Sequence, residues 1–235
     1  MSASRARRRG TAFVVCLLAS ASPIAGRGAA AAEIPGALIV LDAAPGTPGS
    51  EASGAPPRFA LLKDGQVFVG GTGRLETGRL EKAEVQALRR GADAVRKAAG
   101  AAGTLRLGGD EHRVLRLWLP EEKPGEIAIT GDPAAAAPAL QPLAAFLAQL
   151  LSFDHPSLVS YAPAGYAVAA REGRLVGGCR PWSFGFPITA ALRAPQLVPA
   201  ASAEGWPSGA WPASVCVGDH RYLVTLRPLL PGEQP

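Results

Sequence analysis

The stretch Leu80-Glu-Lys-Ala-Glu-Val-Gln-Ala-Leu-Arg-Arg-Gly-Ala-Asp-Ala-Val-Arg-Lys-Ala98 gives the clearest indication of the fold. Its apolar side chains recur three, four and seven positions apart, which places them on one face of an α-helix. Charged side chains occupy the other face, and glycines follow the last apolar position. The stretch therefore predicts an amphipathic helix packed on a sheet. Its apolar face comprises Val85, Leu88, Ala92, Val95 and Ala99, and its polar face includes Glu81, Glu84, Arg89 and Arg96.

Strands are predicted on the N-terminal side of this helix. Residues 37–41 are a short apolar run, and residues 59–62 and 66–69 flank the dipeptide Asp64-Gly65. Asp-Gly between two alternating segments is typical of a tight β-hairpin turn. We therefore expect a strand followed by a hairpin before the helix.

A second group of strands is predicted after the helix. Residues 104–107 and 112–119 lie on either side of Gly108-Gly and predict another hairpin, and residues 126–130 predict a further strand. Within 112–119, leucines alternate with Arg116 and Trp118, which is the period of a half-buried strand.

A second helix is predicted from residue 140 to residue 151, with Pro142 in its first turn, where proline is tolerated. After Pro156, short apolar runs alternate with Gly and Pro, which favours strands and ordered loops. The predicted fold class is α+β: an antiparallel sheet with two helices packed on one face, and a loop-rich C-terminal third. Residues 33–235 are expected to form a single domain. If this domain is divided into two parts, the boundary is expected near residues 131–138.

The N-terminus predicts a cleavable signal peptide over residues 1–32. Four arginines precede the apolar run from Thr11 to Ser20, and Ala29–Ala32 supplies the small residues that signal peptidase requires. The apolar run is shorter than the roughly 20 residues that span a bilayer. Cys16 lies inside this run, which disfavours lipid attachment. We expect a periplasmic or secreted bacterial protein with no stable membrane anchor after cleavage.

The predicted signal peptide accounts for the excess of positive charge. The chain has 24 Lys and Arg against 19 Asp and Glu, and residues 1–32 contain five arginines and no acid, so the remainder has 24 − 5 = 19 basic and 19 acidic residues. Nucleic-acid binding depends on clustered positive charge. A neutral mature chain therefore disfavours a nucleic-acid partner.

Two cysteines remain after cleavage, Cys179 and Cys216. An even pair in an oxidising compartment predicts a disulfide between them. Two unpaired buried thiols, or a thiol pair used for metal or redox chemistry, are the alternatives.

Histidines and aromatic residues are the candidate functional residues. Asp154, His155 and His220 are the weak catalytic candidates, since acids precede all three histidines of the chain, His112 included. No nucleophile elbow accompanies them, and adjacent residues on a strand point to opposite faces, so we expect no metal site and no cofactor. The candidate binding residues lie in the C-terminal third, where exposed tryptophans stack on sugars or peptides: Trp182, Phe184, Trp206 and Trp211. A satellite core is the competing interpretation of these aromatics.

Scattered features resemble a loose group of exported bacterial proteins and lipoproteins of no assigned function. They are the stretch from Phe59 to Val67 with Asp64-Gly65, a helix around residues 85–88, Cys179 with Pro181-Trp182, Cys216, and the closing Tyr222 to Glu233. The resemblance implies export and a single domain, and no activity. The sequence thus predicts a non-enzymatic domain that binds a protein or peptide of the cell envelope; the alternative is an extracytoplasmic hydrolase or metal-dependent enzyme using Asp154, His155 or His220.

Overall fold

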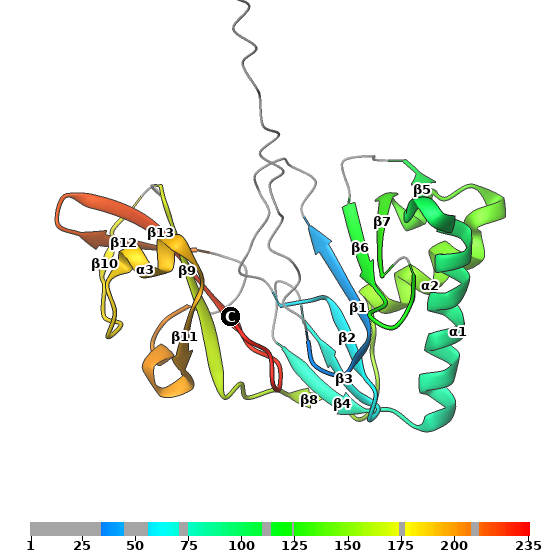
Figure 1. Cartoon of the computed structure of the whole chain (residues 1–235), viewed down its shortest axis with the longest axis horizontal. Helices are drawn as coiled ribbons and strands as arrows, with labels where there is room; N and C mark the ends of the chain where they lie inside the picture. Colours follow the sequence, from blue (N-terminus) through cyan, green and yellow to red (C-terminus); the bar gives the residue numbers. More distant parts are fainter. Residues whose placement is uncertain are drawn as a thin grey trace, which may run out of the picture.

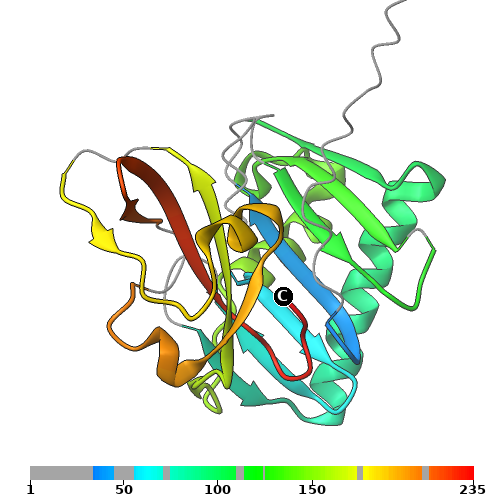
Figure 2. The same cartoon turned by 60° about the vertical axis from the view of Figure 1, so that its left-hand side comes forward.

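The structure is a computed structural model that describes residues 34–44, 56–70, 75–109, 114–123, 125–173, 177–207 and 212–235. The predicted signal peptide, His112 and Trp211 lie outside these residues. The chain forms two lobes, each with its own sheet, and a C-terminal tail that returns between them (Figures 1 and 2). We call residues 34–160 the first lobe, residues 165–228 the second lobe, and residues 229–235 the tail.

The first lobe contains an eight-stranded mixed sheet in the order β5-β7-β6-β1-β2-β3-β4-β8. The hairpin predicted at Asp64-Gly65 is confirmed: β2 and β3 pair antiparallel, and Gly65 has φ +84°, a conformation that glycine adopts without strain. The elements are β1 (Ala37–Ala44), β2 (Phe59–Leu62), β3 (Gln66–Val69), β4 (Glu76–Arg79), α1 (Lys82–Ala99), β5 (Thr104–Gly108), β6 (Val114–Trp118), β7 (Glu126–Gly131), α2 (Gln141–Leu151) and β8 (Val159–Ser160), with 3-10 turns at Gly100–Ala102, Pro133–Ala135 and Pro138–Leu140.

Both predicted helices are confirmed, and both lie on one face of this sheet (Figure 1). The predicted apolar face of α1 is buried, and it shares one cluster with Leu147 and Leu150 of α2 and with Leu117 and Ile129 of the sheet. The helices also contact each other at Gly91, where an added Cβ would lie 2.4 Å from the Phe146 ring. A larger residue at that position would separate the two helices.

The predicted hairpin between residues 104–107 and 112–119 is wrong. β5 pairs instead with β7, in parallel, and β7 lies between β5 and β6. Both β5 and β7 alternate between buried and less buried residues, so each places one face on the core, and this alternation does not fix the order of the strands.

The second lobe contains a separate five-stranded sheet in the order β10-β12-β13-β9-β11. The expectation of one antiparallel sheet is thereby corrected to two mixed, mostly antiparallel sheets within the α+β class. The loop-rich C-terminal third forms enough short strands to close its own apolar cluster around Val168, Trp206 and Val224. The elements are β9 (Gly165–Glu172), β10 (Arg180–Pro181), α3 (Ile188–Arg193), β11 (Gln196–Pro199), β12 (Ala213–Val217) and β13 (His220–Pro228), with a 3-10 turn at Ala200–Ala203.

The lobes are joined by residues 161–164 and by the tail. The tail places Leu230 in a cluster on the sheet face opposite the helices, with Val40 and Phe68. Glu233 accepts a hydrogen bond from the Leu230 backbone N–H and pairs with Arg227 of β13. Residues 131–138 do not divide the sheets, since they connect β7 to α2 within the first lobe.

Candidate functional site

A hollow lined by described residues lies beside the N-terminal half of α1 and has a volume of about 400 Å³. Four segments that are distant in sequence form it: the start of β1, the β2–β3 turn, the start of α1, and the chain just after β6. We call it the α1 groove. Its lining residues are Leu38, Lys63, Asp64, Gly65, Leu80, Lys82, Val85, Gln86, Arg89 and Glu121.

Local structure explains why these segments meet. The Leu80 backbone N–H donates to the Gly65 carbonyl at 2.9 Å, which fixes the hairpin turn against the chain entering α1. The Glu81 N–H then donates to Glu84 at 2.7 Å and closes the first turn of the helix. Val85 faces the core, so its neighbours Lys82, Gln86 and Arg89 are left exposed along the groove.

The two acids of the groove are already matched by cations. Glu121 pairs with Lys63 at 2.6 Å, and Asp64 pairs with Arg79 at 3.2 Å. The Lys63 hydrogen bond lowers the pKa of Glu121, and Arg89 adds to that lowering through its charge. Within the described part of the chain, Lys82 and Arg89 form no ion pair of their own. The groove lining has three cations, Lys63, Lys82 and Arg89, against two acids, Asp64 and Glu121, so it has an excess of one positive charge.

A smaller hollow of about 30 Å³ continues the groove along α1 and shares Leu38, Arg89 and Glu121 with it. Its far end is lined by Asp93. Lys82 and Asp93 are eleven positions apart on one helix, a distance of about 16 Å at 1.5 Å per residue. The site is thus a trough rather than a closed cavity.

The aromatic candidates of the second lobe are largely core residues. Phe184 is 7% exposed and Trp206 is 8% exposed, and the two rings stack at 4.6 Å between centroids. The indole N–H groups are satisfied internally: Trp182 donates to the Phe186 carbonyl at 2.6 Å and Trp206 donates to the Ser183 hydroxyl at 3.1 Å. Phe184 and Trp206 therefore offer little surface for a partner, while Trp182 and Phe186 remain partly exposed.

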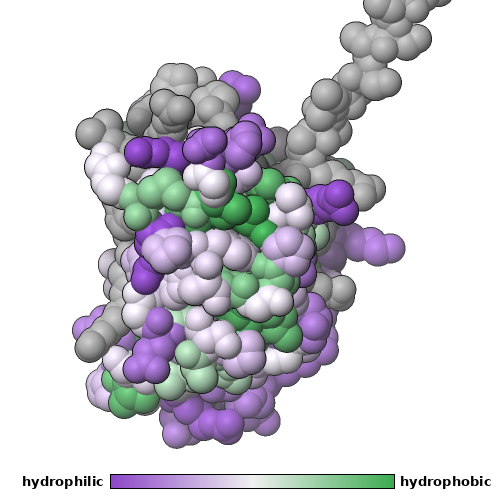
Figure 3. Space-filling view, turned by 90° about the vertical axis from the view of Figure 1, so that its left-hand side faces the viewer, coloured by the Kyte–Doolittle hydropathy of each residue, from purple (hydrophilic) through white to green (hydrophobic). Residues whose placement is uncertain are grey.

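The outer surface of the second lobe is mixed in polarity. In Figure 3, its green apolar patches alternate with pale and purple ones and do not form one continuous surface. Leu197 on β11 and Val217 on β12 are its exposed large apolar side chains among the described residues. Pro195 and Pro199 flank the exposed part of β11, which protects this sheet edge from pairing with another strand.

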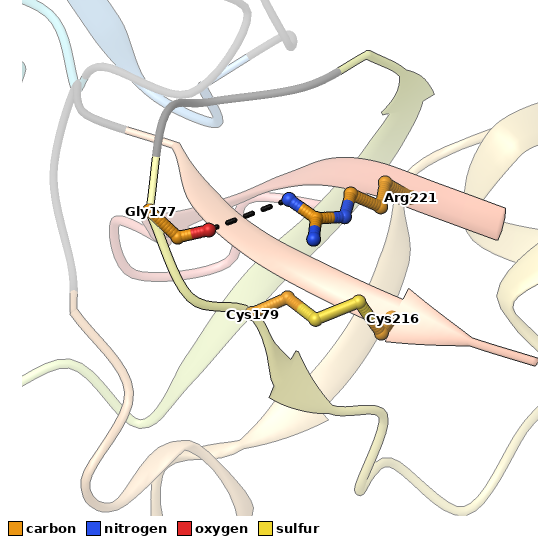
Figure 4. The surroundings of a disulfide bond; sticks show 4 residues. All are labelled: Gly177, Cys179, Cys216 and Arg221. Carbon is orange, nitrogen blue, oxygen red and sulfur yellow. Dashed lines mark hydrogen bonds between the residues drawn. A yellow bond between two sulfur atoms is a disulfide. The ribbon is translucent and has the colours of Figure 1, made fainter. Parts of the chain in front are cut away.

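The predicted disulfide between Cys179 and Cys216 is confirmed (Figure 4). It joins the segment before β10 to β12 with a Cα–Cα distance of 5.6 Å, and the Arg221 guanidinium donates to the Gly177 carbonyl beside it. This disulfide is consistent with an oxidising, extracytoplasmic location. Among the described residues, no helix has the length and apolarity needed to cross a membrane.

His155 joins three segments of the first lobe. Its Nε2 lies 3.2 Å from Glu84 on α1, and its Nδ1 lies 2.7 Å from the Ser157 hydroxyl. A carboxylate only accepts hydrogen bonds, so Nε2 carries the proton that Glu84 accepts. The Glu81 backbone N–H, and then His155, lower the pKa of Glu84 against the opposing effect of desolvation.

The hydrogen-bonded arrangement of Glu84, His155 and Ser157 has the residue types of a hydrolase triad. The serine, however, is poorly placed to act as a nucleophile. Its Oγ accepts from the Arg79 N–H at 3.1 Å and lies against β4, where a Cβ on Gly78 would be 2.5 Å away. A substrate carbonyl has no space on that side, and nucleophilic attack requires close approach to the reacting carbon. The three residues clamp the chain before β8 onto β4 and α1.

The other catalytic candidates are not brought together. Asp154 is exposed and forms no hydrogen bond with His155 or Ser157 in the described structure. His220 is exposed at the β12–β13 turn of the second lobe, with its ring 6.4 Å from that of Tyr222. No group of three or more potential metal ligands occurs among the described residues.

Comparison with protein-family models, with curated proteins and with solved structures returned no match to this chain. The resemblance to exported proteins of no assigned function stays a prediction.

Sequence reasoning did not identify the α1 groove. Arg89 belongs to the polar face of the predicted helix, where sequence alone predicts an ordinary solvent-exposed charge. Lys63 and Glu121 belong to turns, and only the fold brings them beside α1. One local signal existed: Lys82, Gln86 and Arg89 recur four and three positions apart, which forms a polar stripe on the helix.

Proposed function

We propose that the chain is a non-enzymatic, extracytoplasmic domain that binds a protein or peptide through the α1 groove. The single observation that supports this is the groove itself, an open trough of about 400 Å³ with unmatched cations along one wall. Periplasmic or secreted location is part of the proposal.

The shape of the groove favours a peptide over a compact small molecule. Small-molecule sites enclose most of their ligand. The α1 groove is open and continues along the helix for about 16 Å, which an extended chain covers in roughly five residues at 3.3 Å each. A short extended segment of a partner therefore fits its length.

The position of Ser157 favours binding over the hydrolase alternative. A serine nucleophile needs a free hydroxyl that faces the substrate. The Ser157 hydroxyl instead contacts the backbone of Arg79, and His155 and His220 lie in different lobes.

Selection from a phage library of random dodecapeptides tests the proposal. Peptides enriched on the wild-type protein should lose binding to Gln86→Trp, because an indole at this exposed lining position fills the groove. They should retain binding to Arg90→Trp, the matched control on the same helix outside the groove lining. Equal binding to Gln86→Trp and wild type, or failure to enrich any peptide, contradicts the proposal.

A further inference from the structure

The charges around the α1 groove distinguish between classes of peptide. Each acid at its rim has a basic partner: Glu121 has Lys63, and Asp64 has Arg79. At the far end, Asp93 is held by Arg96 and Lys97. Among the described residues, the cations Lys82 and Arg89 form no ion pair, although Arg89 acts on Glu121 through its charge.

We propose that the α1 groove takes an extended, acidic segment of a partner protein, whose carboxylates bind Lys82 and Arg89. This inference rests on the proposed function and adds the chemistry of the bound segment. Glu81 and Glu84 form a capping box at the N-terminus of α1, so the preference rests on the side chains of Lys82 and Arg89.

The spacing of the two cations sets the spacing of the ligand's acids. Lys82 and Arg89 are seven positions apart on α1, a rise of about 10 Å. In a polyproline II chain, residues three apart share one side and are separated by about 9 Å. Two acidic residues with two residues between them therefore match Lys82 and Arg89.

The groove also offers an apolar contact between the two charged positions. Leu38, Leu80 and Val85 line its floor, with Gln86 between the two cations on the helix. An apolar side chain between the two acids would cover these residues. The expected recognition pattern is therefore two acidic residues separated by two residues, at least one of which is apolar.

A labelled hexapeptide, Ac-Ser-Glu-Leu-Ala-Glu-Ser-NH2, and its counterpart with both Glu replaced by Gln test this pattern by fluorescence anisotropy. We expect the wild-type protein to bind the Glu peptide about tenfold more tightly than the Gln peptide, because two exposed charge pairs together contribute about that much affinity. The preference should fall as salt is raised, because exposed charges are screened.

Three variants test the charge preference and the peptide binding separately. The double variant Lys82→Gln with Arg89→Gln should remove the preference for the Glu peptide, and Arg90→Gln, the matched charge control, should leave it unchanged. Gln86→Trp should weaken both peptides. Circular dichroism and thermal unfolding verify that each variant is folded.

The outcomes distinguish the inference from the function. If Gln86→Trp weakens binding but the Glu and Gln peptides bind equally well, the groove binds peptides and the acidic preference is wrong. If the double charge variant keeps the preference, the assignment to Lys82 and Arg89 is wrong. Absence of saturable binding by the Glu peptide overturns the inference, and the phage selection then decides the function independently.

Discussion

The two lobes are held together by different means. The first lobe buries two helices against a long sheet, and its main apolar cluster has roughly twice as many described residues as that of the second lobe. The second lobe has short strands, a compact group of aromatic rings and the Cys179–Cys216 disulfide. A small apolar core gains most from a crosslink, because it has less burial to offset chain entropy.

This difference also separates candidate sites. In the second lobe, Phe184 and Trp206 are needed as core, and the polar atoms of Trp182 and Trp206 are already bonded. In the first lobe, the core consists mainly of aliphatic side chains together with Phe59, and the outer face of α1 is exposed and charged. The proposed binding site therefore lies in the lobe whose stability depends less on its surface.

The largest expected effect is on the core of the first lobe. Leu117 on β6 is fully buried, and Leu117→Ala should lower the free energy of unfolding by about 3–5 kcal/mol through lost burial and the cavity left behind. Chemical denaturation measures this change. The exposed Arg106→Ala on β5 serves as the control, and a loss below about 1 kcal/mol for Leu117→Ala would contradict the assignment of this core.

The next effect concerns the disulfide of the second lobe. Replacing both Cys179 and Cys216 by Ser should destabilise this lobe by about 3–4 kcal/mol, since the bond closes a loop of sequence separation 37. Hydrogen exchange followed by mass spectrometry should show faster exchange in β12 and β13 and unchanged protection in α1. Equal loss of protection in both lobes would mean that the crosslink supports the whole molecule.

The tail is the element that couples the two lobes. Glu233 has a side-chain exposure of 1%, and its partner Arg227 on β13 has 14%, while Leu230 of the same tail packs on the first lobe. Glu233→Gln leaves the partly buried guanidinium of Arg227 without a counter-charge, which should cost about 3 kcal/mol. Calorimetry should show one unfolding transition separating into two. The exposed Glu204→Gln is the control, and a single unshifted transition for Glu233→Gln argues against coupling through the tail.

The smallest effect is a pH dependence at the surface of α1. Hydrogen bonds from Lys97 and then Arg96 lower the pKa of Asp93. A lowered carboxyl pKa stabilises the fold above the ordinary Asp value of about 3.9, and the stabilisation is lost as pH falls through the folded-state value. Asp93→Asn should therefore flatten the decrease in melting temperature between about pH 5 and pH 2. Asp154→Asn, at an exposed position, should leave that decrease unchanged.

The predictability of the fold also follows the division between the lobes. The spacing of Val85, Leu88 and Val95 was enough to predict α1, and Asp64-Gly65 was enough to predict the first hairpin, because both signals are local. The parallel pairing of β5 with β7 was missed, since it joins strands that are separated in sequence by β6, and the alternation of β5 and of β7 is alike. The second sheet was missed because its strands are short and are separated by Gly and Pro. No segment is therefore long enough to show a clear alternation of apolar and polar residues.

The candidate site was the least predictable part. The disulfide followed from an even cysteine count. The binding role of the C-terminal aromatics stays a prediction, and Phe184 and Trp206 are buried, as the competing core interpretation expects. The α1 groove could not be predicted because Lys63, Lys82 and Glu121 come from three separate segments. Only the pairing of charges in three dimensions shows which cations are left unmatched.

The most direct measurement is photo-cross-linking of the wild-type protein to the hexapeptide Ac-Ser-Glu-Leu-Ala-Glu-Ser-NH2 with a diazirine analogue in place of its Leu, followed by mass spectrometric mapping. The account predicts cross-links at the lining of the α1 groove, within residues 63–65, 80–89 and 119–122 of the first lobe. Cross-links concentrated at residues 180–187, beside the partly exposed Trp182 and Phe186, would place binding in the second lobe and contradict it.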